Sequence, residues 1–330
     1  MADYKGVMVL GEGKDGKLAI ITTELLGCGR RLADELGEPL CCLLPGKDTV
    51  KLAKEAIAFG ADKVYVASDG ALETFQTATY RPVVEKVVRE AMPRIVLMGQ
   101  NTVGRDLAPS LAFKLETTVV TDCVEMSIDS GSKALLATKP VYGGNAQAVF
   151  SSEVCPQVVT VRAKAMTALA RDDGRKGEVV EVAAKVDKVK TKVLDKVVED
   201  AEGIRLEDAD VVVAGGRGIG SAEGFKQLEE LAKLFKGAVG ASRPPVDNEW
   251  APTSYQIGLT GKIIAPELYF AIGISGASQH ITGISSVRTV VAINKDPDAN
   301  IFREASYGVV GDWKKILPAF TEKVRELLAN

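Results

Sequence analysis

The chain has 330 residues, of which 46% are apolar and 26% charged, and its net charge is −3. This composition is typical of a globular protein, and the length exceeds what one ordinary hydrophobic core supports, so we expect two domains. Charges of both signs are mixed along the chain and only 5% of residues are aromatic. A nucleic-acid-binding protein, which needs a clustered basic face or a base-stacking platform, is therefore disfavoured.

The sequence contains no signal for secretion or membrane insertion. No apolar stretch approaches the ~20 residues of a membrane span, and the first residues lack the pattern of a secretory signal or a transit peptide. We expect a cytoplasmic bacterial or archaeal protein, with the mitochondrial matrix less favoured. The five cysteines form no C-x-x-C motif, so we expect reduced thiols and no metal or iron–sulfur site.

The first 115 residues alternate between short apolar runs, which are typical of buried parallel strands, and segments with helical spacing. Strands are expected at residues 5–10, 40–44, 63–67 and 94–98, and helices at residues 18–36, 50–59, 80–91 and 103–115. This alternation predicts a mostly parallel sheet flanked by helices.

From residue 119 the pattern changes to one strand after another, with little helical periodicity. These strands are expected at residues 119–128, 133–141, 146–150, 157–161 and 178–186. We expect them to form an extended or antiparallel appendage to the first sheet.

A charged segment at residues 186–203 is the best candidate for a linker, and it divides the chain into domains at residues 1–203 and 204–330. The second domain is expected to contain strands at residues 209–214, 238–241, 263–265, 269–274, 289–293 and 307–310 and helices at residues 221–235 and 313–328. Short strands at this density predict a doubly wound domain, so the fold class is α/β in both halves.

A glycine-rich segment, Gly11-Glu-Gly-Lys-Asp-Gly16, matches the G-x-G-x-x-G pattern of dinucleotide-binding loops and follows a strand. Lys14 and Asp15 are bulky and charged where such a loop approaches a pyrophosphate closely. We therefore favour an ordinary turn here.

In the second domain, segments rich in polar residues and glycine follow one strand after another. These segments are residues 215–220, 241–247, 255–262, 275–280 and 294–297, with Asp312 after the last strand. Because ligands of open α/β sheets bind at the carboxyl ends of the strands, we expect these groups to converge on one edge. Their chemistry suits a long ligand with a pyrophosphate, hydroxyl groups and a polar heterocycle.

The single histidine of the chain, His280, ends the segment Ser275-Gly-Ala-Ser-Gln-His280, which follows an apolar run. This arrangement predicts a strand, a tight turn and the first turn of a helix, whose free N–H groups suit a phosphate. The imidazole would then lie close to the group that the phosphate carries.

Five of these pieces occur together and in order in one known family. They are Gly215-Gly-Arg-Gly218, Ser242-Arg-Pro-Pro245, Gln256-Ile-Gly-Leu-Thr-Gly-Lys262, Ser275-Gly-Ala-Ser-Gln-His280 and Ala292-Ile-Asn-Lys-Asp-Pro297. The series resembles the FAD domain of electron transfer flavoprotein alpha subunits, and the first half of the chain resembles the same family more weakly. The resemblance implies a flavodoxin- or Rossmann-like FAD domain at residues 204–330.

The resemblance implies FAD as the cofactor and no catalytic acid–base pair. The expected cofactor-binding residues are Arg217, Ser242, Arg243, Ile257, Gly258, Leu259, Thr260, Ser275, Gly276, Ala277, Ser278, Gln279, His280, Asn294 and Asp312. Arg243 would lie near the isoalloxazine and Thr260 near its N5, and His280 would donate toward the flavin carbonyl edge. Asn294 and Asp312 would lie on the adenosine side.

The resemblance also implies partners. The first domain would pack on an electron transfer flavoprotein beta subunit, which would hold AMP or a second FAD. Electrons would come from a flavin dehydrogenase, such as an acyl-CoA dehydrogenase of fatty acid beta-oxidation, and pass to a quinone oxidoreductase. In an electron-bifurcating complex, NADH would reduce the second FAD and ferredoxin would be a further acceptor. Residues 281–288 depart from the usual family sequence, and the departure at residues 284–288 leaves bifurcation open.

Two other functions remain as alternatives from the sequence alone. The first is an NAD-dependent dehydrogenase that uses the Gly11–Gly16 loop. The second is a nucleotide-binding regulatory or scaffolding protein that uses the strand-end loops without redox turnover.

Overall fold

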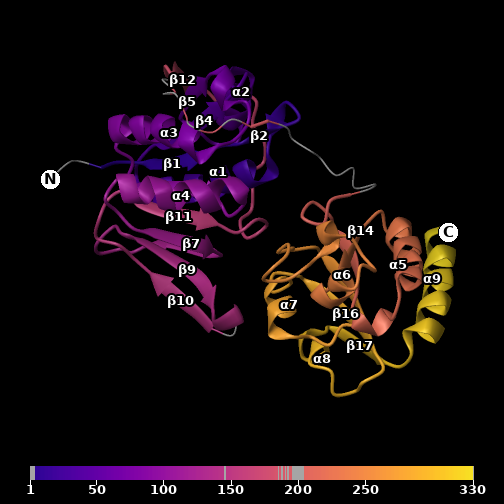
Figure 1. Cartoon of the computed structure of the whole chain (residues 1–330). Helices are drawn as coiled ribbons and strands as arrows, with labels where there is room; N and C mark the ends of the chain where they lie inside the picture. The colour runs from indigo at the N-terminus through magenta and orange to yellow at the C-terminus, as the bar shows by residue number, and fades with distance from the viewer. Residues whose placement is uncertain are drawn as a thin grey trace. The chain divides into compact units, whose positions relative to one another are not determined.

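A computed structural model describes residues 4–144, 146–184, 186, 189, 191, 193–194 and 204–329. The chain divides into two compact units, Met1–Lys196 and Val197–Asn330 (Figure 1). Both units are α/β, as the sequence predicts. The expected boundary after residue 203 and most of the candidate linker lie outside the described residues.

The first unit is built on a parallel sheet of seven strands in the order β12-β5-β4-β1-β6-β11-β7. In that order the strands are Glu178–Glu181, Lys63–Ser68, Leu40–Gly46, Val7–Leu10, Ile95–Gly99, Gln157–Val161 and Val119–Cys123. Two pairs of helices pack against the sheet through two separate apolar clusters. The first pair is α1 (Ile20–Leu36) with α2 (Val50–Ala58), and the second is α3 (Thr77–Ala91) with α4 (Thr102–Lys114).

The antiparallel appendage exists, but it is smaller than expected. It contains β8 (Glu125–Ile128), β9 (Leu135–Val141) and β10 (Ala146–Phe150). The expectation that β7, β11 and β12 belong to it was wrong, because these strands extend the parallel sheet. All five residues of β11 are buried, as in a central parallel strand, although Gln157 and Thr160 are polar.

The second unit contains a parallel sheet of five strands in the order β14-β13-β15-β16-β17. In that order the strands are Ala238–Ala241, Val211–Gly215, Leu268–Ile272, Thr289–Asn294 and Tyr307–Val310. The long helices α5 (Ala222–Leu234) and α9 (Trp313–Ala329) lie side by side and share an apolar cluster with the sheet (Figure 1). Three short helices follow strands: α6 (Arg243–Asp247), α7 (Ser278–Thr282) and α8 (Ile301–Glu304).

The strand expected at residues 263–265 is absent from the structure, so that prediction was wrong. Lys262 makes only an isolated bridge with Ile257, and Ile264 donates its N–H to the carbonyl of Gly283. Pro266 follows directly and has no N–H with which to continue a strand ladder. Ile264 is buried as a core residue of a loop.

The strand order of the second unit decides where a ligand can bind. In chain order β13 is first, β14 lies on one side of it, and β15 lies on the other. The connections from the carboxyl ends of the neighbouring strands β13 and β15 therefore run to opposite sides, toward β14 and β16, and such a point is where open α/β sheets bind ligands.

The described residues give no support for metal or membrane sites. They include no helix that is long and apolar enough to cross a membrane. Nor do they bring three or more His, Cys, Asp or Glu side chains together around a possible metal ion. All five cysteines are free, and burial raises the pKa of Cys28 to about 11 and that of Cys123 to about 12, which makes these thiols unreactive.

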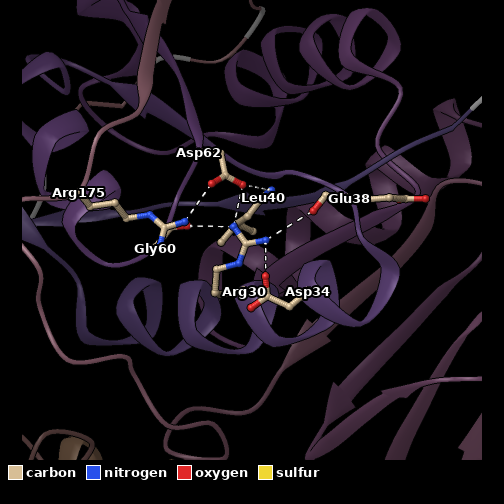
Figure 2. Close-up of polar contacts among 7 residues, drawn as sticks. All are labelled: Arg30, Asp34, Glu38, Leu40, Gly60, Asp62 and Arg175. Carbon is tan, nitrogen blue, oxygen red and sulfur yellow. Dashed lines mark hydrogen bonds and ion pairs between the residues drawn. The ribbon is translucent and has the colours of Figure 1, made fainter.

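A polar network around Asp62 joins the elements of the first unit (Figure 2). Arg30 on α1 donates to Asp62 over 2.7 Å, and Arg175 donates to the other oxygen of the same carboxylate over 2.9 Å. The N–H of Leu40, at the start of β4, donates to Asp62 over 2.8 Å. Burial alone would raise the pKa of Asp62, but these hydrogen bonds outweigh it and lower the pKa. The ionised carboxylate therefore stabilises the junction of α1, β4 and β5.

We expect Asp62→Asn to lower the unfolding free energy of the first unit by about 1 kcal/mol at pH 7, since the carboxylate is 39% exposed and solvent weakens its ion pairs. A group with a lowered folded-state pKa stabilises the fold above its unfolded pKa and loses this effect as pH falls. The difference between wild type and variant should therefore shrink toward pH 3 in denaturant titrations.

Asp34→Asn is the matched control, because Asp34 pairs with the same Arg30 but its side chain is 66% exposed. It should change stability less than Asp62→Asn at pH 7. An Asp62→Asn deficit of equal size at pH 7 and pH 3 would contradict the assigned role of the charge.

Candidate functional site

A cavity of about 680 Å³ lies in the second unit, at the carboxyl ends of its strands. The loops that follow β13, β14, β15 and β16 all contribute to its wall, together with residues 257–260. The sheet topology thus brings segments separated by about 80 residues in the sequence to one place, as the argument from strand ends predicts.

Most of the residues that the sequence singled out line this cavity. They are Arg217, Ser242, Arg243, Ile257, Gly258, Leu259, Thr260, Ser275, Ala277, Gln279, His280 and Asn294. Their contact with a cofactor remains a prediction, since what the structure shows is their shared position.

Three expected site residues are not part of the lining. Gly276 is buried with a φ of 83°, and a side chain there would come within 2.2 Å of the Ile301 nitrogen. Ser278 is exposed at the start of α7. Asp312 accepts a hydrogen bond from the Lys314 N–H over 3.0 Å at the start of α9. Gly276 and Asp312 thus have clear structural roles, and the binding role expected of all three remains a prediction.

The sequence reasoning missed several lining residues. They are Gly218, Pro244, Gly273, Ile274, Lys295, Asp296 and Ala299. Lys295 and Asp296 follow Asn294 in the same strand-end segment, so their position was a usable signal. Ala299 has no such signal, because an alanine five residues after a strand is common in any loop.

Two glycines let the loops after β13 and β15 meet beneath the cavity. The Gly216 N–H donates to Ile272, and the Gly218 N–H donates to the Gly273 carbonyl over 3.0 Å. A Cβ on Gly216 would lie 2.2 Å from the Gly273 oxygen. Only glycine fits there, so the approach of the two backbones depends on it.

The wall of the cavity favours an anionic ligand. It carries three cationic side chains, Arg217, Arg243 and Lys295, against one carboxylate, Asp296. Among the described residues, Arg217 and Lys295 have no acidic partner, whereas Arg243 pairs with Asp247 at 3.2 Å. The backbone N–H groups of Gly276 and Ala277 also find no acceptor within the described chain. These donors suit a phosphate or pyrophosphate.

The loop at residues 256–262 presents polar and apolar groups to the cavity. The buried amide of Gln256 donates to the hydroxyl oxygen of Thr260 over 2.9 Å, which leaves the hydroxyl hydrogen of Thr260 for another acceptor. Next to it, the side chain of Leu259 is 62% exposed. A flat, apolar ligand with polar edges fits this combination.

His280 is buried, and both of its ring nitrogens have protein partners. Nδ1 lies 3.1 Å from the Ile257 carbonyl oxygen and Nε2 lies 2.8 Å from the Tyr269 hydroxyl. Burial lowers the pKa of His280 to about 4, although the Ile257 contact opposes the shift. The ring is therefore neutral at pH 7. The expected donation to a bound flavin would require exchange of one of these bonds, and it remains a prediction.

A second cavity, of about 530 Å³, lies in the first unit beside the Gly11–Gly16 segment. This segment forms the hairpin β2 (Gly13–Lys14) and β3 (Lys17–Leu18), and α1 begins only at residue 20. It therefore lacks the direct strand-to-helix turn of a dinucleotide loop. The wall mixes lysines with the acidic groups Glu12, Asp15, Asp48 and Glu73, a poor environment for a pyrophosphate.

Comparison with known proteins finds family models for both halves of the chain and relatives that match nearly all of it. Residues 7–187 match the electron transfer flavoprotein domain, and residues 205–285 match the electron transfer flavoprotein FAD-binding domain. The chain is 42% identical to an electron transfer flavoprotein subunit alpha of Thermoanaerobacterium thermosaccharolyticum, over 99% of this chain and 100% of that protein. It is 41% identical to the Megasphaera elsdenii protein of the same name, over 99% and 98%. It is also 40% identical to the protein FixB of Clostridium saccharobutylicum, over 100% and 99%.

Proposed function

The chain belongs to the electron transfer flavoprotein alpha-subunit family, and on this premise we propose that it carries FAD in the second-unit cavity and shuttles electrons between flavin dehydrogenases and a quinone oxidoreductase. One observation carries the proposal: a cavity whose wall combines cationic and N–H donors with an apolar loop, at the point where the strand order reverses. The match of residues 205–285 to the FAD-binding domain, which covers most of the lining residues, supports flavin binding.

The residues present fit FAD in size and charge. A cavity of about 680 Å³ is within the range of pockets that hold cofactors. The excess of cationic groups matches the two phosphates of the pyrophosphate. FAD, when bound, supplies the redox chemistry, and the protein supplies binding, orientation and electrostatics.

We assign the two kinds of group in the cavity wall to different parts of the ligand. Arg217, Lys295 and the N–H groups after Ser275 would hold the pyrophosphate, and Asn294 would lie toward the adenosine. The loop with Leu259 and Thr260 would lie against the isoalloxazine, with Arg243 beside it. Arg243 would supply positive charge beside a ring that becomes more negative on reduction, and would thereby favour its reduced forms.

We propose a heterodimer with an electron transfer flavoprotein beta subunit, which would hold AMP or a second FAD and pack on the first unit. Two of the relatives are named subunit alpha, which supports a partner subunit. Electrons would enter from an acyl-CoA dehydrogenase or a related flavin dehydrogenase, in the cytoplasm. The family match favours this carrier over the dehydrogenase and scaffold alternatives, and the hairpin at residues 13–18 gives the dehydrogenase no nucleotide loop.

A bifurcating form of this proposal differs in the source of the electrons. There NADH would reduce a second FAD in the beta subunit, and ferredoxin would be an additional acceptor. Anaerobic addition of NADH to the two-subunit complex separates the forms, because a simple carrier keeps its flavin oxidised without a dehydrogenase.

The function is tested by purifying the chain with its beta subunit, removing bound cofactors and adding back FAD. We expect a yellow complex whose bound flavin is reduced by an acyl-CoA dehydrogenase with its substrate, as the absorption spectrum would report. A complex that stays colourless after reconstitution would contradict the proposal.

Arg243→Ala should lower the reduction potential of the bound flavin, because a positive charge beside the reduced ring is lost. A charge-assisted contact of ~1.5 kcal/mol corresponds to about 60 mV for a one-electron couple. This energy is at the lower end of the usual range for hydrogen bonds to charged groups, because the Arg243 side chain is 64% exposed and solvent weakens the contact. Potentiometric titration with a reference dye measures the shift.

Asp247→Asn is the matched control, since it removes the carboxylate that pairs with Arg243 and leaves the guanidinium in place. It should raise the potential. Potentials unchanged in both variants would show that Arg243 does not act on the flavin.

A further inference from the structure

A buried hydrogen-bonded chain runs beneath the cavity, from the sheet to the loop at residues 256–262. Tyr269 lies in β15 and is fully buried. Within the described chain its hydroxyl has one hydrogen-bond partner, Nε2 of His280, at 2.8 Å. The other ring nitrogen, Nδ1, lies 3.1 Å from the Ile257 carbonyl oxygen.

The chemistry of the three groups fixes the direction of these bonds. A carbonyl oxygen can only accept, so Nδ1 of His280 must donate to Ile257. In the neutral ring Nε2 is then the acceptor, and the Tyr269 hydroxyl must be its donor. The ring is held in one tautomer by a partner on each side. Burial of the ring keeps it neutral at pH 7.

The same histidine connects two segments of the cavity wall. Its backbone belongs to α7, and its Nδ1 holds the loop at Ile257. A second bond joins the same pair of segments, because the Leu259 N–H donates to the Gln279 carbonyl over 2.8 Å. The contact is close: a Cβ on Gly283 would lie 2.5 Å from the Gly258 nitrogen. The imidazole therefore supplies one of several contacts that hold the loop against α7, and it is the one made by a side chain that lines the cavity.

We propose that Tyr269 is a positioning residue of this site. Its hydroxyl donates to His280 and fixes the imidazole in the orientation that holds residues 256–262 against α7. Tyr269 touches no part of the cavity, since its whole side chain is in the core. Its effect on a ligand passes through His280 to the loop that carries Leu259 and Thr260. The effect on FAD rests on the proposed function, whereas the hydrogen-bonded chain is a property of the protein alone.

The single histidine makes the hydrogen-bonded chain directly measurable. In the full-length chain labelled with ¹⁵N-histidine and freed of any purification tag, long-range ¹H–¹⁵N spectra show one imidazole. At pH 7 we expect a protonated Nδ1 and an unprotonated, hydrogen-bonded Nε2. A ring protonated on Nε2, or a mixture of tautomers, would overturn the proposal without any variant.

Tyr269→Phe removes only the hydroxyl. We expect the Nε2 resonance to move toward that of a nitrogen without a donor, and the affinity of the complex for FAD to fall about three- to tenfold, as for the loss of one buried hydrogen bond. Tyr80→Phe is the matched control: it removes a tyrosine hydroxyl that donates to the Leu72 carbonyl over 2.8 Å in the first unit. It should leave both the Nε2 resonance and FAD affinity unchanged.

An unchanged Nε2 resonance in Tyr269→Phe would overturn the hydrogen-bonded chain. A shifted resonance with FAD affinity equal to wild type would overturn the positioning role. If Tyr269→Phe does not fold, the wild-type spectrum still decides whether the Tyr269–His280 hydrogen bond exists. If the wild-type complex binds no FAD, the proposed function fails, while the nitrogen spectrum tests the Tyr269–His280 bond independently.

Discussion

The close approach of two backbones beneath the cavity is the constraint on which the site depends. The loops after β13 and β15 meet because Gly216 leaves room for the Gly273 carbonyl, where a Cβ would lie 2.2 Å from its oxygen. This contact closes the crevice that the strand order opens between β13 and β15. The donors of the following loops, from Arg217 to Ala277, are thereby directed toward one space.

The site contains two kinds of group: side chains that are available to the ligand, and side chains that fix the loop at residues 256–262. Arg217 and Lys295 have no acidic partner among the described residues and are available to phosphates. Gln256 and His280 instead donate hydrogen bonds to Thr260 and to the Ile257 carbonyl, within the loop at residues 256–262. The neutral imidazole, hydrogen-bonded at both nitrogens, therefore belongs with the second kind of group in this structure, although the family resemblance implied a direct donor to the flavin.

The sequence predicts much of this fold because local patterns determine it. Apolar runs mark the strands, and strand-end segments converge wherever a sheet is parallel, which is why most expected residues line one cavity. Partners distant in the sequence were not predictable. Pro266 argues against a strand at residues 263–265, but nothing near them shows that Ile264 joins the core, and nothing near residues 157–161 shows which sheet they enter. Likewise, the bonds of His280 come from Tyr269 and Ile257, 11 and 23 residues away.

The central claim is that the second-unit cavity holds FAD, with its pyrophosphate at Arg217 and Lys295 and its isoalloxazine against the loop of Thr260. A crystal structure of the FAD-loaded complex with the beta subunit tests it most directly. We predict FAD density in this cavity, with the ring beside Leu259 and Thr260 and the phosphates near Gly276 and Ala277. FAD bound to this chain elsewhere, such as in the first-unit cavity beside Gly11–Gly16, would contradict the account.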